Sequence, residues 1–216
     1  MKILAVDTAL GACSVALVED ARVLAHRFVL MERGHAEALA PMVEEAIAAA
    51  GVKFVALDRL AVTTGPGTFT GQRVGLAFMR GLRVALHLPL IGVTTLRTMA
   101  EQAKAETGVA RAVALHDARR GEVYVEIEDV LPPSVMPYQE AIRVLRGLEG
   151  DGLVALAGTA ANRACDALAN NFVLSDVRQP DALWLARLAA TAEAEDLAPR
   201  PLYLRAPDAK LPEAKP

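Results

Sequence analysis

The clearest candidate for chemistry in this chain is a glycine-rich segment, Gly65-Pro66-Gly67-Thr68-Phe69-Thr70-Gly71. An apolar strand is expected just before it, at Leu60–Thr63, and a long helix follows, with Thr68 or Thr70 as its capping residue. A glycine-rich turn that leads into a helix presents unpaired backbone N–H groups, which bind phosphate or another acceptor. The alternative is a turn whose glycines serve packing alone, and the local sequence leaves both interpretations open.

Two familiar nucleotide motifs are excluded at this segment. A P-loop needs Gly-Lys followed by Ser or Thr, and none of the 15 glycines is followed by lysine. The dinucleotide fingerprint fits poorly, because Gly65, Gly67 and Gly71 leave one residue too many before the third glycine. No acidic residue that could hold a ribose lies between Gly71 and Glu101. Walker-type hydrolysis of nucleoside triphosphates is therefore not expected.

Nucleophiles are sparse in this sequence. The three serines, Ser14, Ser134 and Ser175, lie outside any Gly-x-Ser-x-Gly motif, so a serine hydrolase is not expected. Cys13 and Cys165 are too few and too isolated for a disulfide framework or a zinc site. Cys13 lies in an apolar, strand-like run and is expected as a buried free thiol, which suits a reducing compartment.

Apolar periodicity predicts the elements that position the glycine segment. They are strands at Ile3–Val6, Cys13–Val18, Arg22–Phe28 and Pro89–Val93, and helices at Glu37–Ala50, Gly71–His87 and from Thr95 onward. In the helix Glu37–Ala50 the apolar residues recur at helical spacing, and Gly51 follows as a C-cap.

A repeated pattern of acid and glycine indicates two related halves. An aliphatic strand at Ala112–Leu115 is followed by Asp117 and Gly121, with the spacing at which Asp7 and Gly11 follow the first strand. Two aspartates at the same point of two hairpins favour an internal duplication. The alternative is coincidence, because Asp-x-x-x-Gly is ordinary turn chemistry.

The helix Gly71–His87 is apolar around most of its circumference. Its basic residues lie near one stripe: Arg73, Arg80, Arg83 and His87. Its small residues recur four apart, at Gly71 and Gly75 and at Ala77, Gly81 and Ala85, which lets a neighbouring helix approach closely. Either the helix is a core element or it forms a partner surface. Arg73 lies near the positive end of the helix dipole and is the charge that we expect to serve a partner or ligand.

Composition is typical of an aliphatic globular protein. The chain has 216 residues, of which 53% are hydrophobic, 23% charged and 4% aromatic. Its net charge of -3 gives no overall basic field that would recruit nucleic acid by neutralising phosphates. An acid at residue 7 interrupts the first apolar run, and no stretch approaches the length of a membrane span, so a cytoplasmic location is predicted.

The glycine segment extended to residue 75 resembles the Gly-Pro-Gly-Ser-Phe-Thr-Gly-Leu-Arg-Ile-Gly signature of the TsaB (YeaZ) family of bacterial tRNA threonylcarbamoyladenosine biosynthesis proteins. Further matching pieces occur in the same order: Asp7-Thr8, His35–Pro41, Asp117–Tyr124 and Pro201–Arg205. Departures are Thr68 for serine, Gln72 for an aliphatic residue and Ala36 for serine.

The resemblance implies an α/β fold of two actin-like (ASKHA, ribonuclease H-like) lobes, each a mixed sheet flanked by helices. Residues 1–108 would form the N-terminal lobe with the dimerisation helices, and 109–206 the C-terminal lobe. Residues 207–216 are expected as a disordered tail, because their proline-rich, charged composition cannot bury a core.

The same resemblance implies that the nucleotide site is vestigial. Its remaining positions would be Asp7, Thr8, Gly65 and Gly67, with no cofactor of the chain's own and ATP or ADP bound, if at all, in a complex. The catalytic relative TsaD binds its metal through two histidines separated by three residues, whereas His35 is followed at that spacing by Leu39. The other histidines, His26, His87 and His116, form no ligand pair in sequence and are expected at the surface or as caps. No metal site and no catalytic residue are predicted.

The function implied is that of a non-catalytic scaffold in the synthesis of threonylcarbamoyladenosine, beside the anticodon of tRNAs that read codons starting with adenine. The partners implied are a TsaD-type transferase, a TsaE-type ATPase and, for the chain alone, a second copy; tRNA is contacted through the complex, and no membrane is involved. The predicted dimer interface consists of Leu39, Val43, Ile47, Gly71, Arg73, Val74, Gly75, Phe78 and Leu82. The alternative is an autonomous actin-like phosphotransferase or ATPase that uses Asp7, Thr8 and the Gly65–Gly67 loop.

Overall fold

The structure, a computed structural model, describes residues 1–150, 152–168, 170–193 and 197–205. In the first half of the chain, three antiparallel strands are followed by helices that alternate with parallel strands. These elements are β1 (Lys2–Asp7), β2 (Ala12–Glu19), β3 (Arg22–Leu30), α1 (His35–Ala50), β4 (Arg59–Thr63), α2 (Phe69–Leu86), β5 (Leu90–Val93) and α3 (Thr95–Thr107), with a 3-10 helix at Phe54–Ala56 before β4. The strands form one sheet in the order β3-β2-β1-β4-β5.

The second half repeats this plan. Its elements are β6 (Arg111–Asp117), β7 (Glu122–Ile127), β8 (Leu131–Pro137), α4 (Tyr138–Arg146), β9 (Val154–Ala157), α5 (Ala161–Ala167), β10 (Phe172–Leu174) and α6 (Ala182–Thr191). The sheet order is β10-β9-β6-β7-β8, which makes β6 the counterpart of β1 and places the same antiparallel and parallel pairs around it. The predicted duplication is confirmed, because chance turn chemistry would not repeat a whole sequence of strands and helices.

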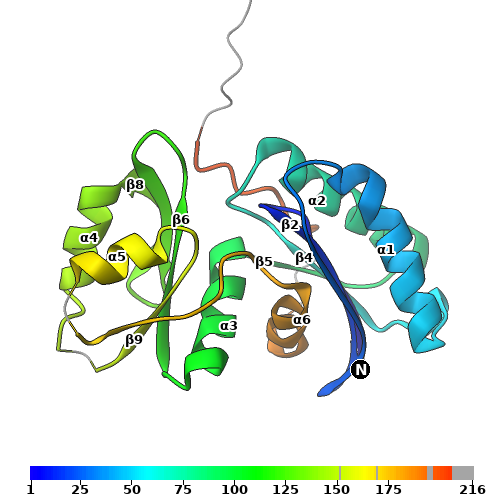
Figure 1. The fold of residues 1–216 in the computed structure, drawn as a ribbon. Coiled ribbons are helices and arrows are strands. Elements are labelled where there is room, and N and C mark those ends of the chain that lie inside the picture. Colours follow the sequence, from blue (N-terminus) through cyan, green and yellow to red (C-terminus); the bar gives the residue numbers. More distant parts are fainter. Residues whose placement is uncertain (151, 169, 194–196, 206–216) are drawn as a thin grey trace, which may run out of the picture.

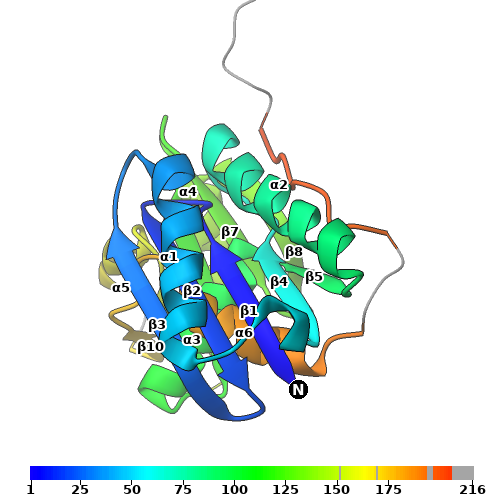
Figure 2. The same ribbon diagram turned by 90° about the vertical axis from the view of Figure 1, so that its right-hand side faces the viewer.

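The two sheets and their helices stack in layers (Figure 1). Helices α1 and α2 lie side by side on the outer face of the first sheet, as the turned view in Figure 2 shows, and α4 and α5 cover the outer face of the second sheet. Helices α3 and α6 fill the space between the sheets and contact each other. Because β1 and β2 are covered on both faces, they are apolar and buried almost throughout rather than alternating.

The layers do not follow the order of the chain. Helix α3 belongs to the first half but packs on β6 and β9 of the second sheet, and α6 belongs to the second half but packs on β1 and β2 of the first. The predicted division into residues 1–108 and 109–206 thus assigns each sheet to one half of the chain, but α3 and α6 each pack on the sheet of the other half. This exchange of equivalent helices joins the lobes, because α3 and α6 contact each other between the sheets, each within its own apolar cluster.

The elements predicted for the first half are all present, and the two-lobed α/β fold is confirmed. Helix α1 ends at Gly51, whose φ of 64° places it in the left-handed region expected of a glycine C-cap. Helix α2 begins one residue after Thr68, whose hydroxyl accepts the N–H of Gly71, so Thr68 rather than Thr70 is the cap. Cys13 is a buried free thiol as predicted.

The last described segment, residues 197–205, has no helix or strand and is called the C-terminal strap below. It runs across the top of the molecule from the first lobe to the hairpin β6–β7 of the second (Figure 1). The predicted tail at 207–216 lies outside the described residues. Over the part of the chain that is described, no helix combines the length and the apolarity needed to cross a membrane.

Candidate functional site

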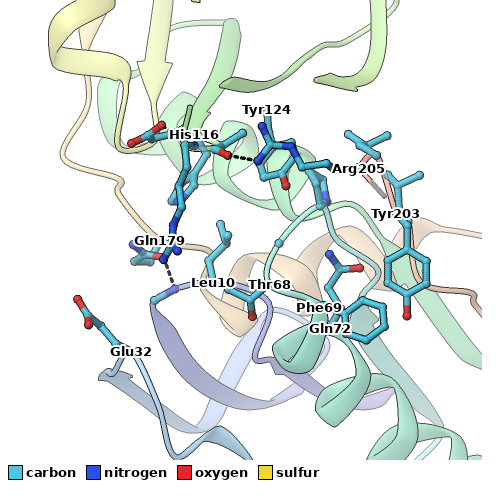
Figure 3. A pocket seen from close by; sticks show the side chains of 18 of the residues that line it. Leu10, Glu32, Thr68, Phe69, Gln72, His116, Tyr124, Gln179, Tyr203 and Arg205 are labelled. Atoms are coloured by element: carbon cyan, nitrogen blue, oxygen red, sulfur yellow. Dashed lines mark hydrogen bonds between the residues drawn. The ribbon is translucent and has the colours of Figure 1, made fainter. Parts of the chain in front are cut away.

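A cleft of about 530 Å³ lies between the lobes, within the size range of small-molecule sites. Residues 10–11 of the β1–β2 turn and 66–69 at the start of α2 line its first-lobe side (Figure 3). Residues 116–119, from the end of β6 and the β6–β7 turn, line the second-lobe side with Tyr124. Further lining residues are Glu32, Arg33, Gln72, Gln179 and residues 202–205 of the C-terminal strap. The two equivalent hairpin turns thus face one cleft, together with the glycine segment that the sequence singled out.

The glycine segment packs against the chain's own first hairpin. A β-carbon on Gly67 would lie 2.2 Å from the carbonyl oxygen of Ala9, and one on Gly71 would lie 2.2 Å from that of Thr8. A β-carbon on Gly75 would lie 2.8 Å from the Thr8 hydroxyl. Contacts this short exclude any side chain, so the close backbone approach expected from the sequence is an approach to the β1–β2 turn.

Thr8 fastens α2 to that turn. Its hydroxyl, which is buried, donates to the carbonyl of Gly71 at 2.7 Å and accepts the N–H of Gly75 at 3.0 Å. One turn earlier, the N–H of Thr68 donates to the carbonyl of Ala9 at 2.8 Å. Thr8 therefore has a structural role in this conformation, and its buried side chain does not line the cleft.

Asp7 is fully buried behind the turn and does not line the cleft. Its Oδ1 accepts the hydroxyl of Thr63 at 2.5 Å and the N–H of Ala9 at 3.3 Å, whereas Oδ2 has no partner. Burial raises the pKa of the Asp7 carboxyl from 3.8 to about 7, and the two hydrogen bonds offset only part of that shift. Asp7 is thus protonated in a substantial fraction of molecules at neutral pH.

Asp117, the counterpart of Asp7, is exposed and does line the cleft. Its Oδ1 accepts the N–H of Arg119 at 2.8 Å, and its own N–H donates to the hydroxyl of Thr159 at 2.9 Å. Arg119 and Arg120 follow in the left-handed region, with φ of 65° and 55°. The duplicated aspartates therefore occupy equivalent positions in sequence but different environments, and they do not form a carboxylate pair.

Both hairpin turns have N–H groups that are bonded within the chain. Gly11 donates to Oε1 of Gln179 at 2.8 Å, a contact visible in Figure 3, and Ala118 donates to the carbonyl of Glu122 at 2.9 Å. A phosphate cradle needs several free N–H groups that converge on one point. Gln179 takes one of the donors that such a cradle would use. Among the described residues, no group of three His, Cys, Asp or Glu side chains could hold a metal ion.

Two buried polar residues of the cleft wall were not predicted as site residues. Gln72, 3% exposed, packs on Gly65, and its Oε1 has no hydrogen-bond partner. His116 is buried rather than at the surface, since it lies on the inner side of β6; burial lowers its pKa to about 4, so it is neutral at physiological pH. The only sequence signal was the departure of Gln72 from the aliphatic residue of the family signature.

The predicted interface residues divide into four groups. Leu39, Val43 and Ile47 are buried in the lobe's own core and present no free surface, because they form the stripe of α1 that faces the sheet. Gly71 and Gly75 are buried against Thr8. Val74, Phe78 and Leu82 are half-buried against the same core. Arg73 has partners inside the chain: it stacks on the Phe69 ring and donates to the Tyr203 hydroxyl.

The exposed surface of these two helices includes small residues, which we call the α1–α2 face, beside charged ones. The face consists of Ala36, Pro41 and Ala48 from α1 and Thr70, Ala77, Gly81, Val84 and Ala85 from α2. Glu37, Glu44 and Glu45 of α1 and Arg73 of α2 are exposed as well. Val84 is 70% exposed, and a β-carbon on Gly81 would meet nothing within 4 Å. Helix α2 is therefore a core element on one side and an open surface on the other.

Comparison with known proteins places this geometry in a family. The family model for TsaD, described as tRNA N6-adenosine threonylcarbamoyltransferase, matches residues 29–131. The tRNA threonylcarbamoyladenosine biosynthesis protein TsaB of Escherichia coli is 47% identical over 57% of this chain, an alignment that spans about half (53%) of that relative. TsaB of Haemophilus influenzae is 30% identical over 95% of this chain and 94% of its own length.

Solved structures agree with the sequence matches. YeaZ from Pseudomonas aeruginosa superposes with a TM-score of 0.79 at 31% identity, covering 94% of this chain and all (100%) of that one. At the level of fold alone, the ADPNP-bound activator of 2-hydroxyisocaproyl-CoA dehydratase from Clostridium difficile superposes with a TM-score of 0.50 at 11% identity over 88% of this chain. The fold is actin-like, and the chain belongs to the TsaB (YeaZ) family.

Proposed function

We propose that this chain is a non-catalytic scaffold in the synthesis of threonylcarbamoyladenosine on tRNA. The observation that carries the proposal is the contrast between two surfaces of the first lobe. At the cleft, the glycine segment packs on the carbonyl oxygens of Thr8 and Ala9, and Gln179 takes the N–H of Gly11. On the outer side of the first lobe (Figure 1), the α1–α2 face is exposed, and its small residues permit close packing of another helix.

The partner proposed for this face is a TsaD-type transferase, which shares with this chain the family model over residues 29–131. A relative with the same helix pair offers a pseudo-symmetric interface, and a second copy of this chain would use the same surface when the transferase is absent. A TsaE-type ATPase and tRNA would be engaged through the assembled complex in the cytoplasm. The chain would carry no cofactor of its own, and ATP or ADP would bind in the complex.

The proposed scaffold role corresponds to a difference between two binding free energies. The chain activates its partner only to the extent that it binds the active conformation of the partner more tightly than the inactive one. Disrupting the open face should therefore lower activity and affinity together.

The test is reconstitution of threonylcarbamoyl transfer to tRNA from purified components, with and without this chain. Gly81→Glu places a long acidic side chain on the open face, where a β-carbon meets nothing within 4 Å, so the variant should fold. Val130→Glu, at a 55% exposed site in the second lobe, is the matched control. We expect activity to require the chain, to be lost with Gly81→Glu and to persist with Val130→Glu. Full activity without the chain would contradict the scaffold role.

One observation favours a second candidate, an autonomous actin-like phosphotransferase or ATPase. Both hairpins keep an aspartate at the equivalent position, Asp7 and Asp117, and Asp117 reaches the cleft. Magnesium-dependent turnover of ATP by the purified chain, abolished in Asp7→Ala and Asp117→Ala, would support this candidate. Absence of turnover in the wild-type chain, at concentrations that support the reconstituted reaction, would exclude it.

A further inference from the structure

The C-terminal strap is held at both ends by different lobes. Its first contacts are on the first lobe: Arg80 on α2 donates to the carbonyl of Pro199 at 3.0 Å through Nε, and the N–H of Leu202 donates to the carbonyl of Thr64 at 2.8 Å. Pro199 also packs closely on β5, where a β-carbon on Gly92 would lie 2.6 Å from its side chain. This part of the strap is fixed along α2 and the edge of the first sheet.

The middle of the strap forms a stack with the first turns of α2. The guanidinium of Arg73 lies 3.5 Å from the centroid of the Phe69 ring and 5.7 Å from that of Tyr203, and the two rings are 5.3 Å apart. The Nε of Arg73 donates to the Tyr203 hydroxyl at 2.7 Å. Phe69 and Tyr203 are 41% and 43% exposed, so this stack lies at the surface.

The far end of the strap reaches the second lobe. Arg205 donates to the carbonyl of Ala118 at 2.7 Å through Nη1 and pairs with the carboxylate of Glu122 through Nη2. Both residues belong to the β6–β7 hairpin, whose turn carries Arg119 and Arg120 in the left-handed region. Because Tyr203 and Arg205 are two residues apart, movement of the stack on α2 is transmitted to the hairpin over a very short length of chain.

We propose that the C-terminal strap is a latch that couples the α1–α2 face to the separation of the lobes. A partner helix seated on the exposed side of α2 meets the Phe69–Arg73–Tyr203 stack at the end of that face and competes with Tyr203 for Arg73. Release of Tyr203 frees Arg205 from the β6–β7 hairpin and lets the cleft open. The link between partner docking and the latch rests on the function proposed above. The link between the strap's contacts with α2 and its contacts with the β6–β7 hairpin does not.

The contacts have the strength that a reversible latch requires. Arg205 and Glu122 keep 23% and 35% of their side-chain surface exposed, and exposed ion pairs change an equilibrium constant by a factor of about five at most. A few such contacts in series hold the strap in place most of the time yet allow it to open without unfolding of the lobes. Because opening of the latch and binding of the partner are thermodynamically linked, a substitution that weakens the latch must also raise the affinity for the partner that opens it.

The first experiment uses the chain alone and measures amide hydrogen exchange. Arg205→Gln removes the second-lobe anchor, and Tyr203→Phe removes only the hydroxyl that accepts from Arg73. We expect Arg205→Gln to accelerate exchange of the Leu202 N–H, which lies on the first lobe, by about threefold or more. We expect Tyr203→Phe to accelerate exchange of the Glu122 N–H in the second lobe. Glu19→Gln, which breaks the Lys2–Glu19 pair at 2.7 Å and touches no part of the strap, is the control and should alter neither amide.

The second experiment measures the affinity of the same variants for the purified TsaD-type partner. A latch that the partner must open predicts tighter binding, by about two- to fivefold, for Arg205→Gln and Tyr203→Phe, and no change for Glu19→Gln. The latch would be overturned if Arg205→Gln altered exchange only in the second lobe and Tyr203→Phe only in the first, whether or not the partner binds. Failure of the wild-type chain to bind the partner would overturn the proposed function and the docking half of the latch, while the exchange data would still decide the coupling between the lobes.

Discussion

Gly67 lies so close to Ala9 that a β-carbon on residue 67 would be 2.2 Å from the Ala9 carbonyl oxygen. The same oxygen accepts the N–H of Thr68, so the loop before α2 is held against the first hairpin by a hydrogen bond that requires glycine at the preceding position. The segment with the strongest resemblance to a phosphate-binding loop is therefore closed on the protein itself.

The first prediction follows from this contact. Gly67→Ala should destabilise the chain by about 2 kcal/mol or more, because neither backbone can retreat without breaking the Thr68 hydrogen bond. Gly81→Ala is the matched substitution on the open side of α2, where nothing lies within 4 Å, and it should stabilise the chain by about 0.5–1 kcal/mol through helix propensity. Urea unfolding of the two variants measures both effects. Equal effects of the two substitutions would mean that the Gly67 contact is not rigid.

The second prediction concerns the two hydrogen bonds of the Thr8 hydroxyl. Thr8→Val keeps the shape of the side chain but removes the hydroxyl that bonds both the carbonyl of Gly71 and the N–H of Gly75 in a buried setting. These two groups are an i, i+4 pair of α2 and can still bond each other, so we expect a loss of about 1–3 kcal/mol. Thr8→Ser keeps the hydroxyl and should lose only the methyl contribution of about 1 kcal/mol. Thermal unfolding distinguishes them, and a Thr8→Val variant as stable as Thr8→Ser would show that the hydroxyl is not what holds α2.

Most of the fold could be predicted because its signals are local. The hairpin Ile3–Val18, the amphipathic helix at Glu37–Ala50 and the repeated Asp-x-x-x-Gly spacing are each visible within a few tens of residues, and the structure contains all three. The exchange of α3 and α6 between the lobes could not be predicted. It depends on which sheet each helix packs against. Apolar periodicity shows only which face of a helix is buried, not which element covers that face.

The candidate site was harder to predict than the fold for a similar reason. A glycine requirement at residues 67, 71 and 75 is visible in sequence, but the group that approaches each glycine comes from a turn about sixty residues earlier in the chain. Leu39, Val43 and Ile47 were predicted as interface residues because an apolar stripe has the same pattern whether it faces the chain's own sheet or a partner. The contacts of Arg73 with Tyr203, about 130 residues away, leave no trace in the local sequence.

The third prediction concerns the pH dependence of stability through Asp7. Its pKa is about 7 in the folded chain and near 3.8 when the chain is unfolded, so between these values the folded state binds more protons than the unfolded state. The contribution of Asp7 to stability should therefore fall as pH rises from about 4 to 7 and should level off above that. The lowered pKa of buried His116, about 4, acts in the opposite sense below 6.5, because there the unfolded chain binds more protons at this residue. Asp7→Asn removes only the contribution of Asp7, so the stability of the variant should gain on that of wild type as pH rises. Unfolding midpoints at pH 5 and pH 8 test this, with Glu44→Gln, at an exposed carboxylate, as the control that should keep the wild-type slope. A difference in stability between Asp7→Asn and wild type that is the same at pH 5 and pH 8 would contradict a raised pKa for Asp7.

The last prediction concerns Gln179, whose Oε1 accepts the N–H of Gly11 at the turn that would otherwise face a phosphate. Gln179→Ala should cost about 1 kcal/mol in stability, the net value of one hydrogen bond, because the freed N–H lies beside the cleft where water can reach it. One free donor does not make a phosphate cradle, since the N–H groups of Ala9 and Thr68 remain bonded within the chain. Magnesium-ATP at millimolar concentration should therefore raise the melting temperature of neither the wild type nor the variant. A ligand-dependent rise in the variant alone would mean that Gln179 is the single group that blocks a nucleotide site, and a rise in the wild type would mean that the turn opens more readily than these contacts imply.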